Sequence, residues 1–308
     1  MNAQPHRFSL SGDIAVERDS HLSDIDWSVL PEGAVRSSFA APSGPLAVFS
    51  LGNPDNHRVV LVPGATGSKE DFALLAPLLA DAGYFVQSFD LAGQFESAPA
   101  GPPPGERYSY KLFVDDLVSF LESGSPSHVL GYSFAGIVAQ LTCVARAELF
   151  NSLTLLTTPP LAGQSFRGVR GIGPLSWFAP ARVGAALMIW GIVTNKNKVP
   201  PGRIAFVRSR FGLTRRDSVT DIIRLMRHTP DVRAEIASQQ LPTLVATGNH
   251  DLWPTRLHLK NANALGARFV VFATGHAPCE TAPHQLAREM VKLFRIAEEG
   301  ETAIDGNG

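Results

Sequence analysis

Short apolar runs alternate with amphipathic stretches over much of the chain. Four of the runs are nearly continuous, as expected of strands that are buried on both faces of a sheet: 58–62, 84–89, 127–130 and 152–156. Residues with helical periodicity separate them, at 71–82, at 109–121 and directly after residue 133. This alternation predicts an α/β fold with a mostly parallel sheet flanked by helices.

The alternation stops after the fourth run and resumes late in the chain, with predicted strands at 243–248 and 268–272. The intervening residues form helical stretches broken by glycine and proline pairs, which indicate a helical insertion. The start of the chain is polar and aperiodic, and a turn-like cluster at 41–44 predicts an opening hairpin. The predicted divisions are an N-terminal extension 1–34, a core of 35–158 and 241–298, an insertion 159–240 and a C-terminal tail 299–308.

Length and composition favour a globular protein with a small-molecule substrate. The chain has 308 residues, 44% of them hydrophobic, which is enough for one large core. Its 27 basic and 28 acidic residues nearly cancel, so no overall field attracts nucleic acid or an anionic membrane. We therefore expect no nucleic-acid partner, while the oligomeric state is not indicated.

Segments for export or membrane insertion are not predicted. Residues 1–27 lack the apolar centre of a secretory signal, and the longest apolar stretch, 183–193, is well short of the roughly 20 residues that span a bilayer. A cytoplasmic location is therefore expected, without a membrane span. Cys143 and Cys279 are isolated, so neither a disulfide framework nor a zinc site is predicted, and we expect no cofactor and no metal.

Ser133 is the candidate nucleophile. It lies in the sequence Gly-Tyr-Ser-Phe-Ala-Gly, residues 131–136, between a predicted strand and a predicted helix. Small residues on both sides are typical of a tight strand-to-helix turn that exposes a serine hydroxyl above the sheet. Ala135 occupies the fifth position of the G-x-S-x-G pattern, where glycine is usual.

An acid and a base follow in the order that such a serine requires. Asp251 comes shortly after the predicted strand 243–248, and His276 follows the strand 268–272. A serine hydroxyl becomes a good nucleophile when an imidazole takes its proton, and a buried carboxylate orients that imidazole and stabilises its charge. The order Ser133, Asp251, His276 therefore predicts a catalytic triad.

Together these features resemble the α/β-hydrolase superfamily over residues 45–295. Three further segments share its motifs: the strand and loop at 58–68, the D-L-A-G-Q-F-E-S segment at 90–97, and the closing G-H-A-P-C-E-T-A-P segment at 275–283. Pro63, Phe95 and Ala135 depart from the usual motifs, so the resemblance indicates a side branch of the superfamily and does not identify a subfamily.

The resemblance assigns further roles. Backbone amides of Ala65 and Phe134 would form the oxyanion hole. The insertion 159–240 would be a helical cap over the active site, and its residues Trp177, Met188 and Trp190 are candidates for the substrate pocket. In the closing motif, Glu280 resembles a residue that begins a helix and complements its dipole.

The predicted function is a serine hydrolase that cleaves a small, mainly apolar ester or thioester through an acyl-enzyme. The same triad also serves carbon–carbon bond hydrolysis, for which cap arginines would hold a substrate carboxylate, and cofactor-free haloperoxidase or perhydrolase chemistry. A protein of this fold that binds a small ligand without catalysis is an alternative of another class. The cap arginines are Arg203, Arg208, Arg210, Arg215 and Arg216.

Overall fold

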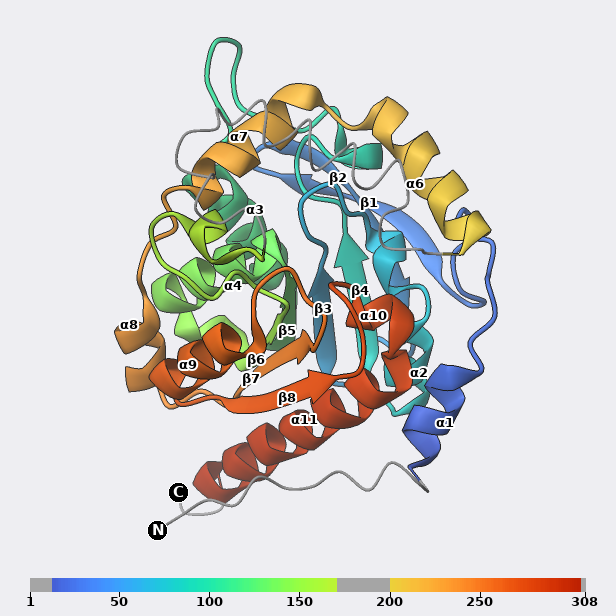
Figure 1. Ribbon diagram of the computed structural model, residues 1–308, viewed down its shortest axis with the longest axis vertical. Helices are drawn as coiled ribbons and strands as arrows, with labels where there is room; N and C mark the ends of the chain where they lie inside the picture. The colour runs from blue at the N-terminus through green and yellow to red at the C-terminus, as the bar shows by residue number, and fades with distance from the viewer. Residues whose placement is uncertain (1–12, 171–199, 306–308) are drawn as a thin grey trace.

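A computed structural model describes residues 13–170 and 200–305. Its centre is an eight-stranded sheet in the order β1-β2-β4-β3-β5-β6-β7-β8 (Figure 1). The first two pairs in this order, β1 with β2 and β2 with β4, are antiparallel, and all the others are parallel. The strands are β1 (Val35–Ala41), β2 (Gly44–Leu51), β3 (Arg58–Val62), β4 (Phe85–Phe89), β5 (Ser127–Tyr132), β6 (Phe150–Leu156), β7 (Thr243–Gly248) and β8 (Arg268–Phe272).

Helices and short 3₁₀ turns connect the strands. The predicted helix 71–82 is divided, because the Asp71 carboxylate accepts the Ser68 amide (3.3 Å) within a 3₁₀ turn, η1, and the α-helix begins only at Leu75. The α-helices are α1 (Ile14–Ser20), α2 (Leu75–Asp81), α3 (Tyr110–Glu122), α4 (Phe134–Ala145), α6 (Pro201–Leu213), α7 (Arg216–Met226), α8 (Arg233–Ser238), α9 (Thr255–Leu265), α10 (Pro278–Thr281) and α11 (Pro283–Asp305). The 3₁₀ turns are η1 (Lys69–Phe72), η2 (Phe95–Ser97), η3 (Ala147–Leu149) and η4 (Ser165–Gly168).

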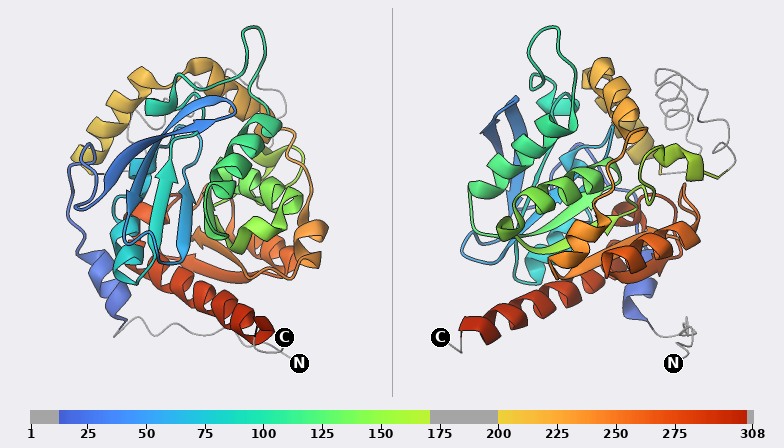
Figure 2. Two further views of the ribbon diagram at one scale, coloured as in Figure 1. Left: turned by 180° about the vertical axis from the view of Figure 1, so that it is seen from behind. Right: turned by 90° about the vertical axis from the view of Figure 1, so that its left-hand side faces the viewer.

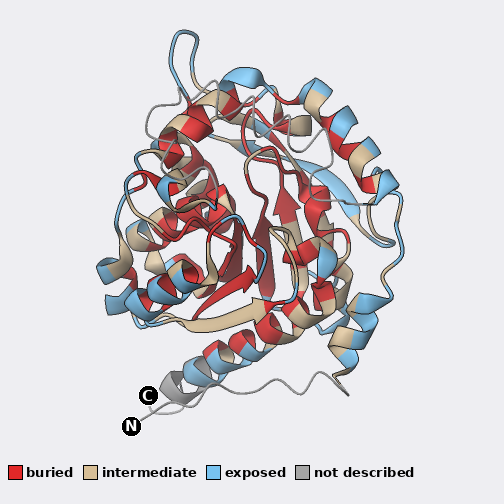
Figure 3. Cartoon of the chain, viewed as in Figure 1, coloured by how far each residue is buried: buried red, intermediate tan, exposed pale blue. Residues whose placement is uncertain are grey.

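Two apolar cores, one on each face of the sheet, hold the layers together. In β3, Val60 and Val62 belong to the core shared with α3 and α4, whereas Val59 and Leu61 belong to the core shared with α2 and α11. Successive side chains of a strand point to opposite faces, so a continuous apolar run serves both cores. Figure 3 shows that central strands such as β3 and β5 are buried, whereas the edge strand β8 is mostly of intermediate burial. The predicted α/β fold with a mostly parallel sheet is confirmed.

The residues between β6 and β7 form an insertion in the sheet. These two strands pair directly, although 86 residues separate their ends. The described part of the insertion consists of η4, α6, α7 and α8. Helices α6 and α7 lie at the end of the molecule opposite the C-terminus of α11 (Figures 1 and 2). Gly163 and Thr229 form an isolated antiparallel bridge near the two ends of the insertion.

The first described residues, at 13–20, pack against α11 more extensively than their sequence indicates. Asp13 pairs with Arg288 (2.6 Å), and the Asp19 carboxylate accepts the backbone amides of His284 and Gln285 at the start of α11. A carboxylate at this position satisfies helix-end donors and complements the helix dipole. Helix α11 continues to Asp305, so the predicted tail 299–308 begins inside it.

A buried histidine is expected to make the fold sensitive to acid. His128 of β5 is fully buried, with Nδ1 2.9 Å from Ser152 Oγ and Nε2 3.3 Å from the Glu298 carboxylate, and its ring stacks on Phe294. Burial lowers the pKa of His128 to about 4, the nearby Glu298 opposing the shift only in part. The unfolded chain then binds more protons between about pH 4 and pH 6.5, so stability falls as the pH is lowered through this window.

We therefore expect His128→Leu to be less acid-sensitive than the wild type. Between pH 6.5 and pH 4 the wild type should lose up to roughly 3 kcal/mol of unfolding free energy through this group. Urea unfolding at a series of pH values measures the loss, and His21→Gln, which changes an exposed histidine, is the control. If the unfolding free energy falls equally with decreasing pH in the wild type and in His128→Leu, His128 makes no such contribution.

Candidate active site

The candidate nucleophile lies on a tight turn between β5 and α4. Ser133 has φ 53° and ψ −119°, a backbone conformation that non-glycine residues seldom adopt. Its amide donates to the Leu156 carbonyl (2.8 Å), and its carbonyl accepts the Gly136 amide (3.0 Å). The turn is thereby fixed to the neighbouring strand β6 and to the first turn of the helix.

Close packing at this turn explains its small residues. A β-carbon on Gly136 would lie 1.8 Å from Thr158 Oγ1, so only glycine fits there. Ala135, where the pattern has glycine, is tolerated with its side chain fully buried. A β-carbon on Gly64 would lie 3.0 Å from the Ser133 β-carbon, which shows how closely the loop after β3 approaches the nucleophile.

Ser133, His276 and Asp251 are linked by hydrogen bonds. His276 Nε2 lies 3.1 Å from Ser133 Oγ, and His276 Nδ1 lies 2.5 Å from Asp251 Oδ1. The His276 side chain is 20% exposed, whereas that of Asp251 is fully buried. A carboxylate at Nδ1 keeps the proton there and leaves Nε2 free to accept the serine proton. The fold brings these three residues together, although Ser133 and His276 are 143 positions apart in the sequence.

The acid has a second imidazole partner that the sequence analysis did not identify. His258 Nε2, on α9, lies 2.6 Å from Asp251 Oδ2, and both side chains are fully buried. Burial acts to raise the pKa of Asp251, but its electrostatic interaction with His276 and the hydrogen bonds from both imidazoles outweigh it and hold that pKa well below its usual range. Asp251 is therefore ionised, as the acid of a triad must be.

The two amides predicted for the oxyanion hole belong to Phe134, which directly follows Ser133, and to Ala65, which follows Gly64 in the loop that approaches Ser133. Phe134 is the first residue of α4, where an amide has no intrahelical acceptor. In the loop after β3, the amides of Thr66 and Gly67 donate to Gln94 Oε1 (3.0 Å) and to the Gly64 carbonyl (2.9 Å). Within the described residues, the amides of Ala65 and Phe134 donate to no protein acceptor.

Gln94 connects this loop with the insertion. It is fully buried, and its carboxamide accepts the Thr66 amide while donating to Ser218 Oγ (2.5 Å) on α7. Thr66 has a positive φ of 61°, so its conformation depends on such support. Ser218 Oγ in turn donates to the Ala92 carbonyl (3.2 Å). A side chain in the segment 90–97 thus holds the loop that presents the Ala65 amide.

A buried ion cluster joins α6 to the loops that follow β3 and β8. Arg203 donates to Asp71 (2.6 Å) and to Glu280 (2.5 and 2.9 Å), and Arg210 donates to Asp71 (2.6 Å) and to Ser68 Oγ (2.9 Å). The four charged side chains are between 2 and 9% exposed. Glu280 lies in the first turn of α10, as predicted, and it is in addition an ion-pair partner of Arg203 in the insertion.

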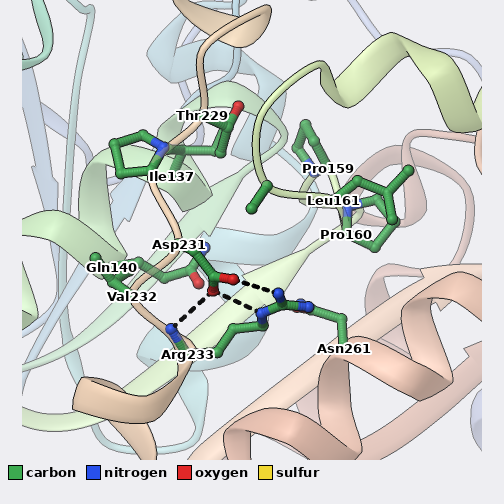
Figure 4. A pocket seen from close by; sticks show the side chains of 12 residues that line it. Ile137, Gln140, Pro159, Pro160, Leu161, Thr229, Asp231, Val232, Arg233 and Asn261 are labelled. Atoms are coloured by element: carbon green, nitrogen blue, oxygen red, sulfur yellow. Dashed lines mark hydrogen bonds and ion pairs between the residues drawn. The ribbon is translucent and has the colours of Figure 1, made fainter.

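A small cavity lies between the insertion and the core, and Ser133 is not among the residues that line it. Its volume is about 20 Å³, and α4, the segment 159–162, the segment 229–233 and Asn261 line it (Figure 4). The ion pair between Asp231 and Arg233 lies beside it. A cavity of this size is large enough for one water molecule but too small for a substrate.

The predicted pocket residues Trp177, Met188 and Trp190 lie outside the described residues. In the described part of the chain, no group of three or more histidine, cysteine or acidic side chains is arranged to hold a metal ion. Cys143 and Cys279 are both buried free thiols. No helix among the described residues is long and apolar enough to cross a bilayer.

Comparison with known proteins identifies the family. Residues 59–289 match the model of the alpha/beta hydrolase family. A comparison of the sequence with curated proteins finds no match.

Solved structures of similar fold extend this finding. A hydrolase from Pseudomonas aeruginosa superposes with a TM-score of 0.68 at 21% identity, covering 84% of this chain and 97% of its own. A carboxylesterase from Nitrososphaera gargenis superposes with a TM-score of 0.70 at 15% identity. The match covers 86% of this chain and 100% of the carboxylesterase. A bromoperoxidase from Bacillus anthracis superposes with a TM-score of 0.70 at 16% identity. The match covers 85% of this chain and 100% of the bromoperoxidase. At these identities the likeness shows the fold, and with the family match it establishes that the chain belongs to the alpha/beta hydrolase family.

Proposed function

We propose that the protein is a serine hydrolase that cleaves a small, mainly apolar ester or thioester through an acyl-enzyme. The observation that supports this most directly is the hydrogen-bonded series Ser133, His276, Asp251, with the serine on a strained turn and the acid buried. Each of the three side chains has the chemistry that its proposed role requires.

In the proposed reaction, Ser133 Oγ attacks the carbonyl carbon of the substrate while His276 Nε2 takes its proton. The developing oxyanion accepts hydrogen bonds from the amides of Ala65 and Phe134, a contribution worth about 2.7–4 kcal/mol per donor in comparable sites. His276 then gives its proton to the leaving alcohol or thiol. In the second half of the reaction, water attacks the acyl carbon while His276 takes a proton from it. His276 then returns this proton to Ser133 Oγ as the acid product leaves.

The ion pairs of the insertion arginines favour a substrate with an uncharged acyl group. Three of the arginines that could attract a substrate carboxylate are already paired: Arg203 and Arg210 with Asp71, and Arg215 with Asp217. Carbon–carbon bond hydrolysis of an acidic substrate therefore has less support than ester hydrolysis. Haloperoxidase or perhydrolase chemistry uses the same triad and oxyanion hole and is the second candidate, because a bromoperoxidase has this fold.

The residues 159–240 are proposed to form a cap that selects the substrate. Their described helices contact loops on the active-site side of the core, through Gln94 to Ser218 and through Asp71 to Arg203. Since none of the three triad residues lies in this segment, the cap would influence which substrate fits rather than the bond-breaking steps.

Labelling of the wild-type protein with a fluorophosphonate probe tests the proposed function. We expect one covalent adduct, at Ser133 by peptide mass spectrometry, and turnover of p-nitrophenyl esters with a preference for neutral acyl groups. A protein that only binds its ligand would give no adduct. Adduct formation with cleavage of a β-diketone but not of esters would replace ester hydrolysis by carbon–carbon hydrolysis. Halide- or peroxide-dependent oxidation without ester turnover would support the second candidate.

A further inference from the structure

The carboxylate of Asp251 lies between two histidines on different elements. Oδ1 is bound by His276, in the loop after β8, and Oδ2 by His258, on α9. In the described residues these are the two side-chain hydrogen bonds of the carboxylate. A buried carboxylate oxygen needs a donor, because water does not reach it.

The surroundings of His258 fix which nitrogen has the proton. Its ring is fully buried, and its Nδ1 has no hydrogen-bond partner among the described residues. A proton on Nδ1 would therefore be an unsatisfied buried donor, whereas a proton on Nε2 is donated to Asp251 over 2.6 Å. The neutral tautomer with the proton on Nε2 satisfies the carboxylate and leaves only an acceptor unused.

His258 lies on a regular helix, whereas His276 lies in a loop. It lies in the interior of the helix α9, and the aspartate occupies the loop between β7 and that helix. A carboxylate held only through His276 could rotate with the imidazole when the proton moves. With the second oxygen fixed to the helix, Oδ1 keeps one orientation toward His276 Nδ1.

We propose that His258 is a positioning residue of the active site, which donates from Nε2 to Asp251 Oδ2 and thereby holds the carboxylate in line with His276. The proposal deepens the proposed hydrolase function and rests on it for its kinetic consequence. His258 touches no reacting atom, so it acts through Asp251. Its effect should appear in kcat rather than in KM, because the substrate-binding surface is unchanged.

Two substitutions separate the hydrogen bond from the bulk of the ring. His258→Gln can place a carboxamide donor near the position of Nε2, whereas His258→Leu fills similar space without a donor. We expect His258→Leu to lower kcat by about 10- to 100-fold with KM nearly unchanged, since misplacement of a catalytic group by about 1 Å has effects of this size. His258→Gln should restore most of the loss. His250→Gln, which changes an exposed histidine beside Asp251, is the control.

A second measurement does not depend on turnover. Long-range proton–nitrogen correlation spectra of the imidazole rings report which nitrogen of each histidine is protonated. In the wild type we expect the proton on Nε2 of His258 and on Nδ1 of His276. The His276 pattern should persist in His258→Gln and change toward mixed tautomers in His258→Leu.

The outcomes distinguish this proposal from the proposed function. A His258 proton on Nδ1 in the wild type, or a His258→Leu protein with unchanged kcat and an unchanged His276 spectrum, would overturn the positioning role. If His258→Leu fails to fold, the wild-type spectrum and the His258→Gln protein still decide the question. An inactive wild type with the expected tautomers would refute the hydrolase proposal while leaving the hydrogen-bond arrangement established.

Discussion

Ser133→Ala is expected to lower kcat/KM for p-nitrophenyl acetate by about 10⁴- to 10⁶-fold and to abolish labelling by a fluorophosphonate, because loss of a triad nucleophile has effects of this size. The change removes one oxygen atom, whose hydrogen bond in the structure is with His276 Nε2. The strained backbone of the turn is unaffected, so the unfolding free energy should change by less than about 1 kcal/mol. Kinetics and urea unfolding of the same preparation measure both quantities.

Controls define what this result means. Ser123→Ala removes a hydroxyl that bonds only to the Phe120 carbonyl at the end of α3, and it should retain full activity. His276→Ala should be impaired as strongly as Ser133→Ala, and the double mutant should be little worse than either, because triad residues act as a unit. A Ser133→Ala protein that keeps more than a few per cent of the activity would exclude Ser133 as the nucleophile.

The sequence was informative wherever a feature depends on neighbouring residues. The strand β3 coincides with the predicted run 58–62, because a run of apolar residues bounded by turns has few other ways to be buried on two faces. The turn at Ser133 was recognisable because its steric requirements fall on adjacent positions. Asp251 and His276 followed from the order of strands, since parallel strands bring their carboxyl ends to one edge of the sheet.

Features that depend on distant residues were not predictable. Glu280 has the local signature of a helix start, and its ion-pair partner Arg203 is 77 positions away. His258 lies in the polar pattern of an ordinary amphipathic helix, and its burial follows from the packing of α9 on β7 and β8. Gln94 falls in a recognisable motif, but its bond to Ser218 spans 124 positions. No periodicity or spacing encodes contacts of this kind.

The ion cluster between core and insertion shows what such contacts contribute. Arg203 and Arg210 share Asp71, and Arg203 stacks over the buried ring of Trp27, 4.5 Å from its centroid. Burial acts to raise the pKa of Asp71, but the two guanidinium charges outweigh it and hold that pKa below its usual range. Ionised Asp71 thus neutralises positive charge that has almost no access to water, and it links α6 to η1, the turn that follows the loop after β3.

Asp71→Asn should therefore destabilise the protein by about 3–5 kcal/mol, the usual loss when one partner of a buried ion pair is removed. The shape of the side chain is kept, but among the described residues Arg203 then has only the Glu280 carboxylate, and Arg210 loses its ion-pair partner. The matched control is Asp217→Asn, since Asp217 also pairs with an arginine of the insertion, Arg215, but is 55% exposed. Exposed pairs contribute about 0–1 kcal/mol. Urea unfolding measures the free energy of unfolding of both variants. An equal, small loss of this free energy in Asp71→Asn and Asp217→Asn would show that the cluster does not hold the insertion on the core.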